Sequence, residues 1–199
     1  MRRLVAALLT APALLGMLVA GCGADTEELS GFVRNPAPDV SGAQIPDASR
    51  GGETFDMKAN QGGVLVVYFG YTSCPDVCPT TLADLRGAMA ILGDDAEKVS
   101  FAMVTIDPER DTGEILTQYV QSFIDGAHSL RSDDDAMLRD AADLFGADYG
   151  VTATEEGDIE VEHTAHLYAV DDTGLIEVTW PFGTASDTIA DDLRILLDT

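Results

Sequence analysis

The chain is poor in basic residues, cysteine and histidine, and each shortage narrows the range of functions it can have. Its 199 residues include 11 lysines and arginines against 35 aspartates and glutamates, a formal net charge of −24. A surface this acidic repels phosphate groups, so nucleic acids and anionic lipid surfaces are poor partners. The sequence also has no Gly-rich phosphate loop and no evident Ser-His-Asp pattern, which argues against nucleotide binding and serine-type hydrolysis.

The N-terminus has the pattern of an export signal. A basic pair, Arg2-Arg3, precedes an apolar run from Leu4 to Val19, and this run is shorter than the ~20 residues of a membrane-spanning helix. Val19-Ala20-Gly21-Cys22 resembles a bacterial lipobox, whose cysteine becomes the lipid-modified mature N-terminus. We therefore expect an exported protein, anchored through Cys22 to the cytoplasmic membrane and facing the periplasm or the cell exterior. Ordinary signal cleavage nearby, with Cys22 incidental, is the alternative.

The remainder is long enough for one domain with a proper core. We expect residues 1–21 to be the lipoprotein-type signal peptide, residues 22–37 to be a polar tether, and residues 38–199 to form the domain. Loss of the signal peptide leaves 9 basic and 35 acidic residues. The acidic residues are spread over the whole chain, as expected for a solvated acidic surface.

The hydrophobic pattern of the domain predicts an α/β fold. The apolar run Val64–Phe69 is typical of a buried strand, and Leu82, Leu85, Met89 and Leu92 follow at helical spacing. The other expected elements are short strands within 39–57, a strand at 99–106, a helix after residue 112 through 123, a helix at 133–145, a hairpin at 151–161, strands at 167–170 and 176–180, and a helix at 184–197. The inner face of the helix ending at 123 is expected to carry Ile115, Leu116, Tyr119, Val120 and Phe123. The order of the elements predicts a thioredoxin-like central mixed sheet flanked by helices, with an N-terminal β extension and a hairpin insertion.

Two cysteines four residues apart form the most informative feature. Cys74 and Cys78 directly follow the buried strand and open the next helix, at the sheet edge where ligands usually bind. We expect the helix N-terminus to lower the pKa of the thiols and favour the thiolate, a nucleophile and soft-metal ligand. Because a proline disfavours α conformation in the residue before it, Pro79 is expected to keep Cys78 out of the helix proper. This spacing alone leaves metal chelation and disulfide formation equally open.

The chain offers few further candidates for a site. His163 and His166 lie three apart at a strand entry, so both cannot readily face one site. A lone histidine in a strand is more often structural, but with two thiols it makes a donor set for copper or zinc. We expect His128 to be an ordinary loop residue. For Asp76 and Asp107 we expect helix capping, with a place beside the site as the alternative.

Three ordered motifs carry a resemblance to a known family. They are GYTSCPDVCP at residues 70–79, DPERDT at 107–112 and VEHT at 161–164. Together they resemble the Sco/SenC family of membrane-anchored, thioredoxin-fold proteins, from about residue 38 to the C-terminus. The resemblance implies that Cys74, Cys78 and His163 bind copper and that the protein helps to build the CuA centre of cytochrome c oxidase. His166 falls outside the family's motif.

The chain departs from expected patterns at two points. Glu162 stands before the histidine where the family commonly has aspartate. No proline lies between Pro108 and Pro181, so the cis-proline that helps thioredoxins to dock their substrates has no counterpart. The second departure weakens the interpretation as a general disulfide oxidoreductase.

Two main hypotheses follow. The first is a lipid-anchored copper metallochaperone that holds one Cu(I) or Cu(II) ion and passes it by ligand exchange to cytochrome c oxidase subunit II or another copper acceptor. The second is a thiol–disulfide oxidoreductase, with Cys74 and Cys78 as its redox-active pair, that reduces a partner's cysteines without carrying copper. A peroxidase or redox sensor is a third possibility. Zinc competes for the same donors, but a structural zinc site normally needs a fourth ligand, and none is evident.

Overall fold

The computed structural model describes residues 28–153 and 159–198. The predicted signal peptide and Cys22 lie outside these residues. The elements, in chain order, are β1 (Gln44–Asp47), η1 (Ala48–Arg50), β2 (Glu53–Asp56), β3 (Val64–Gly70), α1 (Val77–Leu92), η2 (Gly93–Lys98), β4 (Val99–Thr105), α2 (Gly113–Phe123), β5 (His128–Leu130), α3 (Asp135–Phe145), β6 (Tyr149–Ala153), β7 (Ile159–His163), β8 (His166–Val170), β9 (Ile176–Pro181) and α4 (Ser186–Leu197).

A seven-stranded mixed sheet forms the centre of the molecule, in the order β2-β1-β5-β4-β3-β8-β9. Strand β3 pairs in parallel with β4 and antiparallel with β8, and all seven of its residues are buried. Strands β6 and β7 form a separate two-stranded hairpin. The predicted fold class, with its N-terminal β extension and hairpin insertion, is confirmed.

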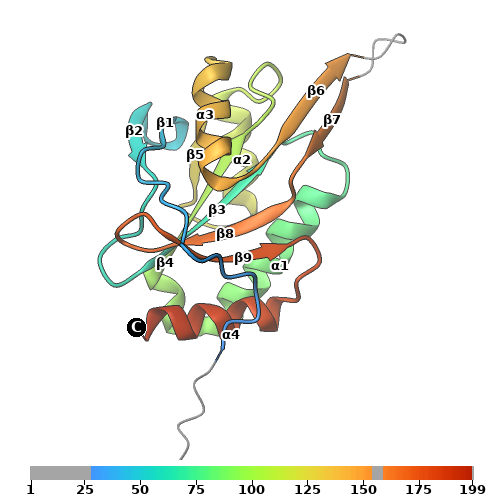
Figure 1. Cartoon of the computed structure of the whole chain (residues 1–199). Helices are drawn as coiled ribbons and strands as arrows, with labels where there is room; N and C mark the ends of the chain where they lie inside the picture. The colour runs from blue at the N-terminus through green and yellow to red at the C-terminus, as the bar shows by residue number, and fades with distance from the viewer. Residues whose placement is uncertain (1–27, 154–158, 199) are drawn as a thin grey trace, which may run out of the picture.

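Helices cover both faces of the sheet (Figure 1). Helices α1 and α4 pack against each other on one face, where Trp180 Nε1 donates a hydrogen bond of 2.7 Å to the Asp192 carboxylate of α4. Helix α3 packs on the opposite face, where its Phe145 ring lies 5.2 Å from the rings of both Phe69 and Tyr168. Because side chains alternate along a strand, β3 sends Tyr68 toward α1 and Phe69 toward α3.

Helix α1 follows directly from its sequence. Pro79 lies in its first turn, where the missing N–H leaves no hydrogen bond unmade. Leu82 and Leu85 are completely buried, and burial of each contributes about 2–3 kcal/mol. Gly93, with φ of 63°, ends the helix. We expect Leu85→Ala to destabilise the domain by about 2–5 kcal/mol.

The N-terminal segment differs from the expectation of a free tether at residues 22–37. Its described part lies on the domain: the backbone N–H groups of Ser30 and Gly31 donate to the Asp192 carboxylate at 2.7 and 3.0 Å, and Phe32 pairs with Thr179. A Cβ on Gly31 would lie 2.4 Å from a Val178 methyl, so only glycine fits this approach. The domain therefore begins before residue 38. Most of these contacts are made by the main chain of the segment. Its polar side-chain composition therefore gave no sign that it packs on the domain.

Two further expectations need correction. His128 lies in strand β5, which was not anticipated, and its Nδ1 is 2.7 Å from the buried carboxylate of Asp47. Of the residues expected on the inner face of α2, Leu116 and Val120 are buried as predicted, but Ile115 is 46% exposed. The expected hairpin forms, although its turn at 154–158 lies outside the described residues. None of the helices in the described part of the chain is long and apolar enough to span a membrane.

Candidate metal centre

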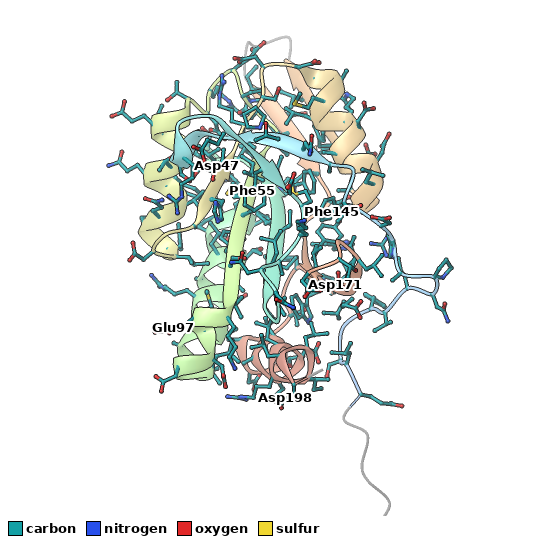
Figure 2. The ribbon with its side chains drawn as sticks, turned by 90° about the vertical axis from the view of Figure 1, so that its left-hand side faces the viewer. Asp47, Phe55, Glu97, Phe145, Asp171 and Asp198 are labelled. Atoms are coloured by element: carbon teal, nitrogen blue, oxygen red, sulfur yellow. The ribbon has the colours of Figure 1, made fainter. Side chains whose placement is uncertain are left out.

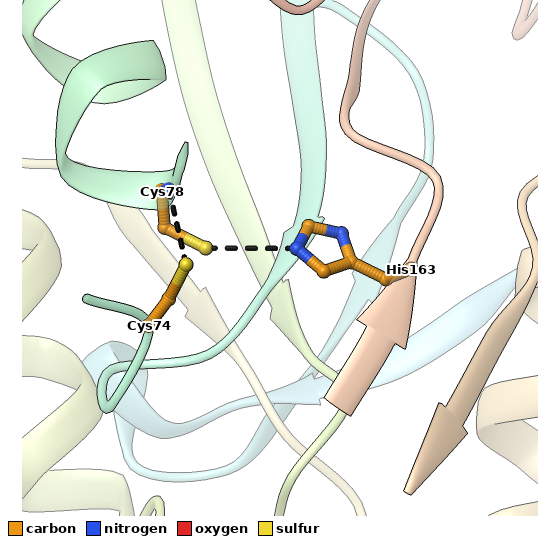
Figure 3. Close-up of side chains that lie close together, drawn as sticks. All are labelled: Cys74, Cys78 and His163. Atoms are coloured by element: carbon orange, nitrogen blue, oxygen red, sulfur yellow. Dashed lines mark hydrogen bonds between the residues drawn. The ribbon is translucent and has the colours of Figure 1, made fainter. Parts of the chain in front are cut away.

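Three elements bring together the two cysteines and His163 (Figure 3). Cys74 lies in the loop after β3, Cys78 in the first turn of α1, and His163 at the end of β7. One donor atom from each lies within 4.8 Å of the other two. Cys78 Sγ is 3.8 Å from His163 Nε2. The three residues singled out by the resemblance thus meet at one point, at the carboxyl end of the central strand.

The start of helix α1 differs from two expectations, one about Cys78 and one about Asp76. Cys78 is helical despite the following proline, because α1 begins at Val77. Asp76 precedes the helix, but its side chain makes no capping hydrogen bond. The free N–H of Cys78 instead donates to Cys74 Sγ at 3.2 Å. A helix N-terminus that lacks a carboxylate cap therefore presents a donor to sulfur.

Burial controls the ionisation of Cys78. The side chain is completely buried, and desolvation raises the pKa of its thiol to about 12, although Tyr68 donates a hydrogen bond to the sulfur at 3.4 Å. The expectation that the helix N-terminus would favour the thiolate is wrong for this residue, since burial outweighs it. A bound metal ion supplies the positive charge that allows such a thiol to ionise.

His163 is oriented as a ligand. Burial lowers the pKa of its half-buried imidazole, which favours the neutral form. Its Nδ1 lies 3.2 Å from the Thr164 carbonyl oxygen, so an Nδ1–H donates there and Nε2 keeps its lone pair toward Cys78. The rings of Tyr68 and Tyr71 stand edge-on to the imidazole at 6.0 and 5.9 Å. The contact with the Thr164 carbonyl favours the proton on Nδ1, and the two tyrosine rings hold the direction of the imidazole.

A buried carboxylate that sequence reasoning missed supports the cysteine loop. Asp111 is fully buried. Its carboxylate accepts hydrogen bonds from the Thr72 backbone N–H at 3.1 Å and from the Thr105 hydroxyl at 2.6 Å, and the Thr72 hydroxyl donates to it as well. Asp111 thereby ties the loop of Cys74 to the end of β4. The only sequence signal was its place in the motif at 107–112.

Asp107 does not cap helix α2 as expected. The capping residue is Thr112, whose hydroxyl accepts from the Ile115 N–H at 3.3 Å. Asp107 is nearly buried and forms an ion pair with Arg110. The Arg110 guanidinium lies 5.7 Å from the centre of the Tyr71 ring, which itself borders the site.

The site is open to solvent beside Cys74 and His163. A cavity of about 460 Å³, lined in part by Cys74, Val161 and His163, adjoins it. Cys78 does not line this cavity. The accessible side of the site therefore belongs to Cys74 and His163. His166 takes no part, since its ring lies beside Tyr168 at 6.0 Å.

The spacing of the donors fits one soft metal ion. An ion held in a plane at about 2.3 Å from sulfur and about 2.0 Å from imidazole nitrogen places these two atoms about 3.7 Å apart. The separation between Cys78 Sγ and His163 Nε2 is 3.8 Å. The group contains no carboxylate. Two sulfurs and one nitrogen suit copper or zinc better than the hard cations magnesium and calcium.

Known proteins resemble this chain over the same region. The family model described as SCO1/SenC matches residues 48–198. A SCO2-like protein of Rickettsia prowazekii is 31% identical over 125 residues, which cover 62% of this chain and 60% of that protein. The chain therefore spans about three fifths of that curated relative.

Solved structures give the same result. The copper-bound structure of ScoI from Bradyrhizobium japonicum has a TM-score of 0.65 at 30% identity and covers 79% of this chain and 96% of that one. The apo Sco1 solution structures from Thermus thermophilus give a TM-score of 0.71 at 29% identity, with coverage of 83% and 95%.

Proposed function

The chain belongs to the SCO1/SenC family, and we propose that it is a metallochaperone that carries one copper ion as its cargo on Cys74, Cys78 and His163. The observation that carries the proposal is the meeting of two thiols and one imidazole within 4.8 Å, without a carboxylate. Thiolates suit Cu(I), and the added imidazole makes Cu(II) tolerable. The copper-bound structure of ScoI from Bradyrhizobium japonicum supports copper over zinc.

The three residues have different roles in holding and releasing the ion. Cys78 is buried in the core and binds the ion from the side away from solvent. Cys74 and His163 line the adjoining cavity, so a partner's cysteine approaches from their side and replaces them first. The acceptor we propose is cytochrome c oxidase subunit II, at its CuA centre, or another copper acceptor. The sequence resemblance supports this assignment.

We also propose that the protein acts on the outer face of the cytoplasmic membrane. The support is the apolar run of residues 4–19 and the lipobox-like sequence that ends at Cys22. The mass of the mature N-terminal peptide tests this assignment. Diacylglycerol on Cys22 supports the anchor, whereas an unmodified peptide that starts elsewhere contradicts it.

A titration with Cu(I) tests the copper proposal. The reduced chain, begun after Cys22, is titrated under anaerobic conditions against a competing chelator. We expect one tight equivalent of copper, lost in both Cys74→Ser and Cys78→Ser. His128→Asn serves as a matched control, because its amide can still donate to Asp47 and it lies away from the site. Weak binding by the unaltered protein contradicts the proposal.

A thiol–disulfide oxidoreductase is the second candidate. It is favoured by the contact between the Cys78 N–H and Cys74 Sγ, which holds two free thiols side by side. It requires both cysteines but leaves His163 dispensable. Reduction of a disulfide-bonded acceptor peptide by unaltered protein and by His163→Ala decides between the two. Equal activity, combined with weak copper binding, favours the oxidoreductase.

A further inference from the structure

A second cavity lies on the face of the sheet opposite α1 and α4. It encloses about 350 Å³ between residues 32–34 of the N-terminal segment, the end of α3, and strands β8 and β9. Phe145, labelled in Figure 2, forms part of its wall. The cavity shares no lining residue with the cavity beside Cys74. It is therefore separate from the metal centre.

Two buried hydroxyl groups mark this cavity. Tyr168 and Thr179 both line it, are 1% and 6% exposed, and face each other across β8 and β9. Neither hydroxyl has a hydrogen-bond partner among the described residues. Buried hydroxyl groups in native proteins nearly always have a partner. Six buried side-chain atoms lack a partner among the described residues, but only these two lie on paired residues beside one cavity, where an acceptor from outside the chain would satisfy them.

Arg34 adds a positive charge to the same cavity. Its Nη2 donates to the Phe145 carbonyl oxygen at 3.1 Å, but in the described part of the chain it forms no ion pair. Burial, and then the charge of Arg34, lower the pKa of His166, which also lines the cavity and is therefore neutral near pH 7. Arg50, Lys58 and Arg86 also form no ion pair among the described residues, but of these four cations only Arg34 lines the cavity.

The rest of the cavity wall is apolar. Phe32 and Val33 are 66% and 58% exposed at its edge, and Phe145 is fully buried at its side. An apolar cavity with a few convergent polar groups is the usual form of a small-molecule site. The general repulsion of anions by the acidic surface is screened beyond about 10 Å at 0.1 M salt, so the groups that line the cavity decide what binds.

We propose that this cavity binds an amphipathic anion, namely an apolar chain that bears one carboxylate or phosphate head group. The head group accepts hydrogen bonds from Arg34 and, after a rotation of the Tyr168 side chain that uncovers its buried oxygen, from the Tyr168 hydroxyl. The apolar chain lies against Phe32 and Phe145. The proposal does not depend on copper, because no residue of the metal centre takes part.

Decanoate and decyl phosphate are the probes, titrated into the reduced, metal-free, full-length protein and followed by amide NMR. We expect saturable shifts confined to residues around 32–34, 145–146 and 166–168. Arg34→Gln and Tyr168→Phe should each weaken binding about tenfold, as expected for a lost hydrogen bond to a charged group. Arg34→Lys, which keeps the charge, should retain most of the binding.

A matched control separates the site from a general effect of lost hydroxyl groups. Tyr119 also has a buried hydroxyl without a partner among the described residues, but it does not line this cavity. Tyr119→Phe should bind both probes as the unaltered protein does. Without a probe bound, Tyr168→Phe should have a melting temperature no lower than that of the unaltered protein, since the variant loses only an unpartnered hydroxyl. Its weaker binding is then not a consequence of unfolding.

Three results would overturn the proposal. The first is the absence of saturable binding by either probe. The second is binding by Arg34→Gln and Tyr168→Phe that is as tight as binding by the unaltered protein. The third is an equal affinity of the unaltered protein for decyltrimethylammonium, a cationic amphiphile of the same chain length. Binding of only one of the two anions supports the proposal and identifies the head group. A copper titration in parallel keeps this outcome distinct from the fate of the metallochaperone proposal.

Discussion

The two halves of the metal centre are held in very different ways. Cys74 lies in the loop after β3 and Cys78 in the first turn of α1, two elements of the buried core, and Asp111 ties the loop to the end of β4. His163 lies at the end of the β6–β7 hairpin, which projects away from the main sheet (Figure 1). No residue of β7 is fully buried. The site thus combines a fixed pair of sulfurs with a histidine on the more weakly held β6–β7 hairpin, which we call the arm.

Tyr149 and Val161 attach this arm to the body, since Tyr149 is buried in the hydrophobic core and Val161 packs against it. The Tyr149 hydroxyl donates to the Asp135 carboxylate of α3 at 3.1 Å, and the Arg139 guanidinium lies over the Tyr149 ring at 4.5 Å. At the base of the hairpin, the Thr164 N–H donates to the Asp148 carbonyl oxygen at 2.8 Å and joins the two strands to each other. A metal ion bound by all three ligands would add a direct link between arm and core. Movement of the arm would free the ion from His163 and leave it on the two thiolates, which a partner's ligands then have to replace.

Removal of the support behind the cysteines should have the largest effect on the fold. Asp111→Ala leaves the Thr72 N–H and two threonine hydroxyls without their acceptor. We expect the free energy of unfolding to fall by about 3 kcal/mol, measured by urea unfolding, together with weaker Cu(I) binding. Asp95→Ala is the control, because Asp95 forms only an exposed pair with Lys98. Similar stability of the two variants would show that Asp111 does not hold the loop.

Removal of the arm's ligand should weaken copper binding without affecting the fold. In His163→Ala two thiolates remain, and these still suit Cu(I). We expect the Cu(I) affinity to fall about tenfold, which is ~1.4 kcal/mol, while Cu(II) binding is lost and urea unfolding is unchanged. Chelator competition with each oxidation state measures this. An affinity loss as large as in Cys78→Ser would contradict the division into two halves.

The attachment of the arm should have the smallest effect and should depend on pH. Burial, and then the hydrogen bond to Asp135, raise the pKa of Tyr149 to about 12, against about 10 in the unfolded chain. The protonated phenol thus stabilises the folded state fully below pH 10, and this stabilisation is lost as the pH rises from 10 through 12. Tyr149→Phe should cost about 1 kcal/mol at pH 8.

Urea unfolding of both proteins at pH 8, 10 and 11 checks this sign. The difference between the unaltered protein and Tyr149→Phe should narrow as the pH rises. A difference that stays constant over this range would mean that the phenol hydrogen bond does not hold the arm.

The core and the position of the cysteines could be predicted from the sequence because local patterns determine them. The continuous apolar run at 64–69 requires a strand buried on both faces. The helical spacing after Pro79 requires a helix, so the cysteines had to lie where the strand passes into the helix. His163 could not be placed by pattern alone. Its assignment rested on the resemblance of the residues around it to a known motif.

The features that escaped prediction depend on contacts distant in sequence. The hydrogen bonds of Asp111 to Thr72 cross 39 residues, and a carboxylate in a polar turn looks the same whether exposed or buried. His128 belongs to a three-residue strand that is too short to show a period. The raised pKa of Cys78 comes from burial, which no local pattern reports.

X-ray absorption spectroscopy of the Cu(I)-loaded protein tests the central claim most directly. A centre that joins two core sulfurs to the histidine of the arm should show two sulfur neighbours at about 2.3 Å and one nitrogen at about 2.0 Å. His163→Ala should lose the nitrogen and keep both sulfurs. A spectrum without the nitrogen neighbour, or one that His163→Ala leaves unchanged, would contradict the claim that copper is held by both halves.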